Sequence, residues 1–388
     1  MRFILTINAG SSSIRFAFYQ VGVALARCLH GKLDRIGESD AILTFSSRGD
    51  VDGRFSVPEG CSVSRFLWEW LEQQLEFKEL IAVGHRIVHG MRHSAPERIT
   101  GELLVELSGL LSYDPEHLPL EIELIESAKE RHPNLSQIAC FDTAFHQFMP
   151  RVATLLPLPR RYEAMGVRRY GYHGLSYAYL MEELVQLGDR AATNGRVVLA
   201  HLGHGASLAA VRDGVGIDTS MGFTPTSGIV MGSRSGDIDP GLVSFLAETE
   251  GMTPEQFRHL TNQESGLRGV SETSSDMRDL LMKEATDVRA AEAISLFCYQ
   301  AKKGVGAFAA VLGGIDTLVF AGGIGENCAS IRSRICAGLD FLGIEINETH
   351  NDAHEAVISP AGGAVKVRVI RTDEEHMIAL LVLRLTES

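Results

Sequence analysis

The sequence predicts an α/β protein of two domains, in which mixed sheets are layered with helices. Three observations lead to this prediction. Strand-like and helix-like stretches alternate along the chain. The length of 388 residues exceeds what one hydrophobic core usually organises. A pattern of strand, small-residue turn and strand occurs once in each half, which suggests two related domains.

The first half begins with two strands around a turn of small residues. The stretch TINAGSSSIRFAF, residues 6–18, places one glycine and three serines between apolar runs. Helical spacing over 64–77 predicts a helix, and LIAVGHRIVHG at 80–90 reads as a buried strand that runs into a loop. A second helix is expected over 115–133, stopped by its last proline, and a buried strand follows at 136–145.

The second half repeats the opening pattern. GRVVLAHLGHGASLAAVRDG at 195–214 again predicts strand, small-residue turn and strand. Residues 290–314 have apolar positions at helical spacing, and 315–332 predict strand, glycine turn and helix. Prolines loosen the pattern near 150–165, so the domains are expected at 1–150 and 151–373, with a final helix over 374–388 that packs back on the first domain.

Composition excludes several classes of function. The formal net charge of −13 argues against a nucleic-acid partner. No apolar run is long enough to cross a membrane, and the first residues read as a strand and not as a signal peptide. Six cysteines without a CxxC pair predict reduced thiols in a cytoplasmic protein, with neither a metal cluster nor a disulfide framework.

Three glycine-rich turns are candidates for binding an anion. A single hairpin with a polar tip is most often structural, but two matching hairpins and a third strand–GGIGEN–helix turn favour a divided nucleotide site. No Walker motif or dinucleotide fingerprint occurs. The hairpins themselves are therefore predicted to hold the phosphates.

Charged side chains in the loops after strands complete the candidate site. Arg86 and Arg234 lie among Gly, Ser and His residues and could bind carboxylate or phosphoryl oxygens, although an exposed ion pair is the commoner role for an arginine. His173 precedes a predicted helix, where packing is the ordinary alternative. Asp142 ends a buried strand, so its charge needs a partner or a metal, and Glu374 could simply favour the dipole of the last helix.

These stretches together resemble the acetate kinase family of carboxylate kinases. The matching segments run in the family's order from residue 7 to residue 375: INAGSSS, VGHRIVHG, FDTAFH, RRYGYHG, HLGHGAS, DTSMGFTP, MGSRSGDIDPG, SSDMRDL, GGIGEN and TDEE. The resemblance implies two duplicated actin-like (ribonuclease H-like) domains with a nucleotide cleft between them. It also implies a homodimer that moves phosphate between ATP and acetate or propionate, with Mg²⁺ or Mn²⁺.

The resemblance also assigns roles by position. Asn8 and Glu374 match the family's metal-linked residues, and Arg86 matches its substrate arginine. Asp142, His173 and Arg234 match the catalytic set. The segments that contact ATP in the family correspond here to Arg15, His201, Leu202, Gly203, His204, Gly205, Asp276, Met277, Arg278, Gly323, Ile324, Gly325, Glu326 and Asn327.

Three residues depart from the family's pattern. Arg15 stands where the family usually has lysine, and His204 and Asp373 stand where it usually has asparagine. These changes leave room for an altered phosphoryl donor. The alternatives are a kinase for propionate or another short acid, an actin-like ATPase switch without an acid substrate, and a catalytically weak binding protein.

Overall fold

The computed structural model describes residues 1–10, 13–36, 41–47, 50–58, 60–111 and 113–387. The chain divides into two compact units. Unit 1 comprises Met1–Phe145, Gly174–Tyr179 and Asp373–Ser388, and unit 2 comprises His146–His173 and Leu180–Thr372. Ser11 and Ser12, in the first predicted turn, lie outside the described residues.

Unit 1 is built on a mixed sheet whose described strands follow the order β5-β4-β3-β2-β1-β6-β8-β7. β1 pairs antiparallel with β2 and parallel with β6, and β6 pairs parallel with β8. The strands are β1 (Arg2–Ala9), β2 (Ser13–Val21), β3 (Ala26–Asp34), β4 (Ile42–Ser47), β5 (Asp50–Ser56), β6 (Leu80–Ile87), β7 (Glu97–Arg98) and β8 (Ser136–Phe141).

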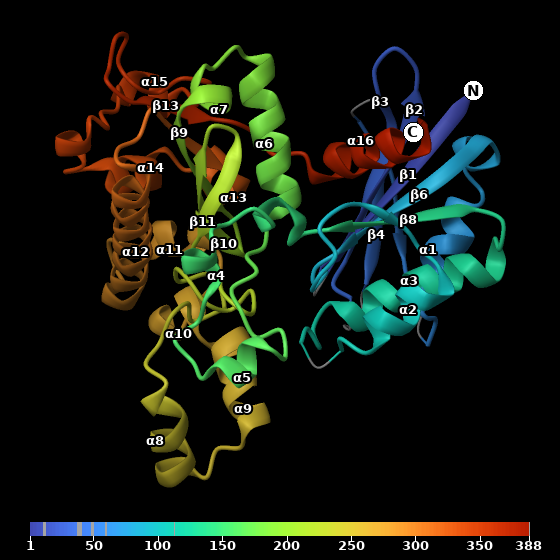
Figure 1. Cartoon of the computed structure of the whole chain (residues 1–388), viewed down its shortest axis with the longest axis horizontal. Coiled ribbons are helices and arrows are strands. Elements are labelled where there is room, and N and C mark those ends of the chain that lie inside the picture. Colours follow the sequence, from blue (N-terminus) through green and yellow to red (C-terminus); the bar gives the residue numbers. More distant parts are fainter. Residues whose placement is uncertain (11–12, 37–40, 48–49, 59, 112, 388) are drawn as a thin grey trace. The chain divides into compact units, whose positions relative to one another are not determined.

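Both faces of this sheet are covered, so β1 is apolar on its two sides. Leu5 and Ile7 face a core that includes Trp68 of α1 (Val63–Leu71) and Leu124 of α3 (Leu118–Arg131). Ile4 faces the opposite core, which α16 (Glu374–Glu387) completes. Figure 1 shows α2 (Gly101–Ser108) and α3 on one side of the sheet and α16 on the other. The last helix therefore belongs to unit 1, although the chain runs through Leu180–Thr372 of unit 2 immediately before it returns to unit 1 at Asp373.

The predicted helix over 64–77 is shorter in the structure. α1 ends at Leu71, and η1 (Leu75–Glu79) follows after Gln74 takes an extended backbone. The side-chain amides of Gln73 and Gln74 donate to the carbonyls of Glu69 and Trp70, which satisfies the last turn of the helix and ends it. The other described helices that belong to unit 1 are α2 (Gly101–Ser108) and η2 (Ala144–His146). The last residue of η2, His146, is assigned to unit 2.

Unit 2 repeats the connectivity of the first sheet. Its described strands follow the order β11-β10-β9-β12-β13. The pair β9–β10 is antiparallel, and β9–β12 and β12–β13 are parallel, as are β1–β6 and β6–β8 in unit 1. The strands are β9 (Arg196–Leu202), β10 (Ala206–Arg212), β11 (Val215–Thr219), β12 (Thr317–Ala321) and β13 (Lys366–Val369). The prediction of an α/β fold with two related sheets is confirmed.

The long helix α12 (Val288–Leu312) packs against β9 and β10. Its start is capped by the Asp287 carboxylate, and Gly313 ends it in a left-handed conformation. The other helices of unit 2 are α4 (Arg151–Thr154), α5 (Arg160–Glu163), α7 (Ala191–Asn194), α8 (Gly241–Glu250), α9 (Pro254–His259), η3 (Leu260–Glu264), α10 (Gly266–Ser271), α11 (Met277–Lys283), α13 (Gly322–Asn327), α14 (Ala329–Cys336), η4 (Asp340–Leu342) and α15 (Glu348–Asp352).

Helix α6 (Gly174–Gln186) begins in unit 1 and continues in unit 2. Among the described residues, no helix has both the length and the apolar composition that a membrane span requires.

Candidate active site

In unit 1 the predicted substrate arginine and the predicted catalytic aspartate form a buried ion pair. Arg86 lies near the end of β6, and Asp142 directly follows the neighbouring parallel strand β8. Because parallel strands end at one edge of the sheet, the two side chains meet there. Arg86 NH2 lies 2.9 Å from Asp142 Oδ2, and NH1 donates to the carbonyl of Ala9 at 3.1 Å.

Burial strengthens this pair. The Asp142 side chain is 0% exposed and that of Arg86 is 12% exposed. Burial alone would lower the pKa of the Arg86 guanidinium, but the carboxylates of Asp142, Glu374 and Glu121 outweigh it and raise that pKa. The Nε of Arg86 has no hydrogen-bond partner among the described residues. The guanidinium therefore remains charged and keeps a donor for a further acceptor.

Glu121 of α3 lies in the same buried region, and sequence reasoning missed it. Both of its carboxylate oxygens accept from the backbone N–H of Val88, each at 3.2 Å. Burial raises the pKa of Glu121 well above its ordinary value, although the charge of Arg86 acts in the opposite direction. The helical pattern of 115–133 places an acidic residue on a buried face, which was the available signal.

The predicted metal residues are also joined in unit 1. The side-chain amide of Asn8 donates to Glu374 at 2.9 Å and to Glu375 at 3.0 Å. Glu375 was not predicted; burial and then the neighbouring charge of Glu374 raise its pKa. Arg15 is the cross-strand partner of Asn8, and its charge opposes that increase. No group of three or more His, Cys, Asp or Glu side chains arranged for a metal occurs in the described ranges.

Asp373, one of the three departures, forms hydrogen bonds away from Asn8. Its carboxylate accepts from Arg27 NH1 at 3.1 Å and from the hydroxyl of Tyr19 at 3.4 Å. It also accepts from the backbone N–H of His376, in the first turn of α16. Its extra charge is therefore paired locally with Arg27.

In unit 2 His173 and Arg234 converge at the turn of the β9–β10 hairpin. A Cβ atom on Gly205 would lie 3.2 Å from Nε2 of His173 and 3.6 Å from NH1 of Arg234. The ring of His173 stacks on that of His201, with centroids 4.3 Å apart, and its Nδ1 lies 2.8 Å from the hydroxyl of Ser207. Glycine at 205 thus leaves open the space that the His173 ring and the Arg234 guanidinium face.

His204 connects this turn to two more of the predicted segments. Its ring lies against Gly232, where a Cβ would approach Nδ1 to 2.4 Å, and its carbonyl accepts from the backbone N–H of Gly232. Desolvation and then the charge of Arg234 lower the pKa of His204, while Asp276 opposes the shift. Asp276 caps α11 and pairs with Arg278 at 2.6 Å. The carboxylate of Asp276 therefore already has a cationic partner.

The GGIGEN segment forms the helical turn α13 against the same hairpin. Gly322 has φ +75°, and a Cβ there would lie 2.8 Å from the carbonyl of Leu202. The Glu326 carboxylate turns inward and accepts from the N–H groups of Gly322 and Thr372. Gly323 and Asn327 are exposed on this turn. The side chains of Leu202 and Met277 belong to the core, so only their backbones can contact a ligand.

Arg332 fixes the end of this turn and was also missed. It is fully buried and donates to the carbonyls of Gly325 and Glu326 at 2.8 Å and 3.1 Å. Its other donors bond to Asn351. A buried arginine is rare, and no sequence pattern predicts this one, because the carbonyls of Gly325 and Glu326 and the oxygens of Asn351 surround it only in the folded chain.

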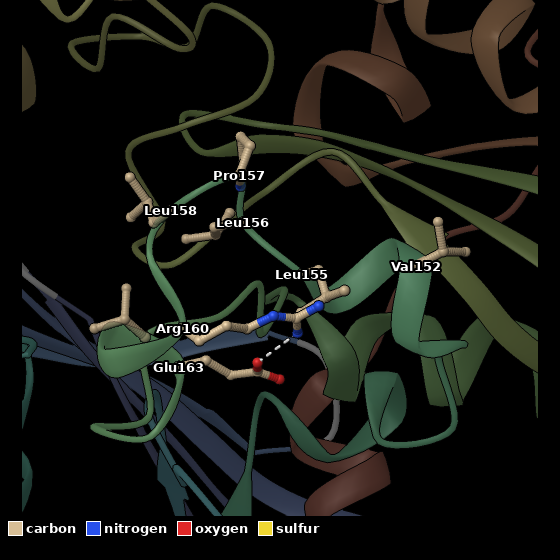
Figure 2. Close-up of a pocket in the computed structure, with 8 residues that line it drawn as sticks. Val152, Leu155, Leu156, Pro157, Leu158, Arg160 and Glu163 are labelled. Atoms are coloured by element: carbon tan, nitrogen blue, oxygen red, sulfur yellow. Dashed lines mark hydrogen bonds and ion pairs between the residues drawn. The ribbon is translucent and has the colours of Figure 1, made fainter.

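A separate hollow of about 320 Å³ lies in the segment from Val152 to Val167. Figure 2 shows its apolar lining and the ion pair of Arg160 with Glu163. In the part of the chain that the structure describes, none of the predicted site residues lines it. The hollow is therefore distinct from both groups of site residues described above.

Comparisons with known proteins agree with the sequence resemblance. Residues 3–380 match the model of the acetokinase family. An acetate kinase of Methylocella silvestris is 40% identical over 401 aligned positions, which cover 100% of this chain and 98% of that protein.

Two solved structures are also similar to this chain. A propionate kinase of Francisella tularensis superposes with a TM-score of 0.91 at 34% identity, covering 98% of this chain and 99% of that one. An acetate kinase of Porphyromonas gingivalis superposes with a TM-score of 0.89 at 33% identity, covering both chains fully.

Proposed function

The chain belongs to the acetokinase family, phosphotransferases with a carboxyl acceptor, and we propose that it transfers phosphate reversibly from ATP to acetate, giving acetyl phosphate and ADP. The observation that supports this most directly is the convergence of His173 Nε2 and Arg234 NH1 at Gly205. A histidine ring nitrogen and a guanidinium at a glycine turn suit an anionic phosphoryl group, because both can donate hydrogen bonds to its oxygens. An ATPase switch without an acid substrate would not need them.

The chemistry follows from charge. Acetate is ionised at neutral pH, so it attacks the γ-phosphorus without a general base. The obstacle is the crowding of negative charge, which positioned cations relieve. Arg86 would hold the carboxylate, since its guanidinium is buried, charged and keeps an unpartnered Nε donor among the described residues. His173 and Arg234 would contact the transferred phosphoryl group.

Asp142 acts in this proposal by orienting Arg86. Its carboxylate lies 2.9 Å from Arg86 NH2, and its other oxygen accepts from the N–H of Leu175 at 3.2 Å. Both oxygens are thus occupied by donors, which suits a positioning role better than proton transfer.

The oxygen atoms around Asn8 fit a hard divalent cation. Asn8, Glu374 and the newly found Glu375 present an amide and two carboxylates, and magnesium takes one or two carboxylates besides water and phosphate oxygens. Burial and then the neighbouring charge of Glu374 raise the pKa of Glu375, and a bound cation would offset the repulsion between the two carboxylates. When bound, magnesium or manganese neutralises charge on the phosphates.

A trapping assay tests the proposed function. Purified protein is incubated with ATP, magnesium and one acid in hydroxylamine, which converts an acyl phosphate to a hydroxamate. Hydroxamate formed with acetate is the expected product. A larger kcat/KM with propionate would favour the second candidate, a propionate kinase, which the similarity to the Francisella tularensis structure supports. ATP hydrolysis indifferent to any acid would contradict both.

We also propose that the protein is a homodimer. Helix α8 has no buried residue in the described structure, yet it presents Leu242, Val243 and Phe245, the last 58% exposed. Apolar side chains grouped on an exposed helix mark an interaction surface. Light scattering after size exclusion is expected to give twice the chain mass, and Phe245→Glu is expected to shift the species toward the monomer. A monomeric wild-type protein would contradict this.

The expected compartment is the cytoplasm. All six cysteines are free thiols in the structure, which is typical of a reducing environment. Cell fractionation with an antibody against the protein checks this expectation.

A further inference from the structure

Ser207 and His201 form a platform for the ring of His173. They are cross-strand partners in the antiparallel β9–β10 pair, so their side chains point to the same face of the sheet. His201 contributes a stacked ring at 4.3 Å, and Ser207 contributes a hydroxyl 2.8 Å from Nδ1. Ser207 is 0% exposed, which keeps water from competing for Nδ1.

The backbone of His173 adds to this argument. Its φ of +59° and ψ of +24° place a non-glycine residue in the left-handed region, just before α6. Such a conformation persists only where the surroundings over-determine it, and it is found most often at functional sites. The strain and the platform together hold the ring with Nε2 toward Gly205 and Arg234.

The hydroxyl decides which ring nitrogen carries the proton. If Ser207 donates to Nδ1, the neutral ring has its proton on Nε2; if Ser207 accepts from Nδ1–H, then Nε2 bears a lone pair. Only the first arrangement lets the neutral ring donate to a phosphoryl oxygen beside Arg234. We propose that Ser207 is a positioning residue that donates to Nδ1 of neutral His173 and so presents Nε2–H to the phosphoryl group. This rests on the proposed function.

A serine suits this role better than a carboxylate or a carbonyl. Its hydroxyl can reverse direction and accept from Nδ1–H when His173 is protonated, so Nε2 carries a proton in both charge states. Charged or titratable groups near the ring include His201, Arg234 and, on the same turn, His204; the next residue, Gly174, donates to the carbonyl of Asp142. Because Ser207 keeps a proton on Nε2 in both charge states, the activity of the wild-type protein is expected to depend little on the protonation of His173.

Nitrogen NMR of the histidine side chains tests the tautomer directly. The protein is labelled with ¹⁵N-histidine, and His173→Gln assigns the signals of residue 173. The neutral ring is expected to show a protonated Nε2 and an acceptor Nδ1. A neutral ring with its proton on Nδ1 would overturn the proposal. This result does not depend on activity, so it separates a failure here from a failure of the proposed function, which the hydroxamate assay detects in the wild-type protein.

Kinetics test the consequence. Ser207→Ala is expected to lower kcat about tenfold, because the variant loses one hydrogen bond to the ring. The KM values for ATP and acetate are expected to stay within about twofold of the wild-type values. The loss is expected to be larger at pH 8.5 than at pH 6, because the imidazolium carries a proton on Nε2 without help. Ser207→Thr, which keeps the hydroxyl, is expected to restore most of kcat.

Ser220→Ala is the matched control. The Ser220 hydroxyl accepts from the backbone N–H of Leu208 at 2.9 Å, and Leu208 lies next to Ser207 on strand β10. Its removal costs one hydrogen bond to the fold but leaves the ring untouched, so kcat is expected to stay within about twofold. An equal, pH-independent loss in the Ser207 and Ser220 variants would mean that Ser207 is only structural.

Discussion

Replacing Asp142 separates the need for its shape from the need for its charge. In Asp142→Ala the buried Arg86 guanidinium loses its counter-charge, and the N–H of Leu175 loses its acceptor. Removing one partner of a buried ion pair costs about 3–5 kcal/mol, a large share of the roughly 5–15 kcal/mol that stabilises a typical protein. We therefore expect Asp142→Ala to be markedly less stable in urea unfolding.

Asp142→Asn keeps the shape but not the charge. Its amide oxygen can still accept one hydrogen bond, so we expect a smaller cost of about 1–3 kcal/mol. The orientation of Arg86 would nevertheless loosen, and a misplaced binding group costs about 10²-fold in rate. We expect kcat/KM for acetate in the hydroxamate assay to fall by about that factor in the asparagine variant as well.

Glu69→Ala is the control for loss of a carboxylate. Its partner Arg65 is 69% exposed, and exposed pairs contribute at most about 1 kcal/mol. Near-normal turnover in Asp142→Asn, beside an inactive Asp142→Ala, would refute the requirement for negative charge at this position. Wild-type stability in Asp142→Ala would refute the structural importance of the pair.

Three further predictions concern two glycines of helix α12, the buried His85 and the ring of His204. On helix α12, the new Cβ of Gly306→Ala would meet no atom within 4 Å, so this variant is expected to raise the free energy of unfolding by about 0.5–1 kcal/mol. Gly304→Ala would place a Cβ 2.2 Å from the side chain of Leu208 and is expected to lower the free energy of unfolding by about 1–3 kcal/mol. Urea unfolding of both variants checks this, and equal effects would contradict it. Burial lowers the pKa of His85 to about 4, so the unfolded chain binds the proton more readily. The contribution of neutral His85 to the free energy of unfolding is fully present above pH 6.5 and is lost as the pH falls toward 4, by about 3 kcal/mol in all. The unfolding free energy of His85→Leu is therefore expected to depend less on pH over that range. The pKa of His204 is also lowered, so its ring is neutral at pH 7 and gains a charge only on acidification. The KM for ATP is expected to fall below pH 6.5 in the wild-type protein more than in His204→Asn, and identical profiles would show that His204 does not face the nucleotide.

Local patterns in the sequence were sufficient for the fold class. Alternating apolar runs predicted the strands β1, β2, β6 and β8, and helical spacing predicted α3 and α12, because burial on one or two faces requires these periods. The repeated strand–turn–strand pattern correctly indicated two related sheets. The end of α1 was missed, because side-chain amides of Gln73 and Gln74 cap it, and capping geometry is not visible in hydrophobic spacing.

The residue types of the site were also readable in the sequence, since glycine turns with arginine and histidine after strands favour anion binding. What the tertiary structure decided is which of them touch. It joined Arg86 to Asp142 across parallel strands, added Glu375 beside Asn8, and placed His173 on Ser207 and His201. Such contacts depend on strand register and chain crossings between segments far apart in sequence, and a linear pattern contains no information on the direction of a side chain or on the partner of a buried charge.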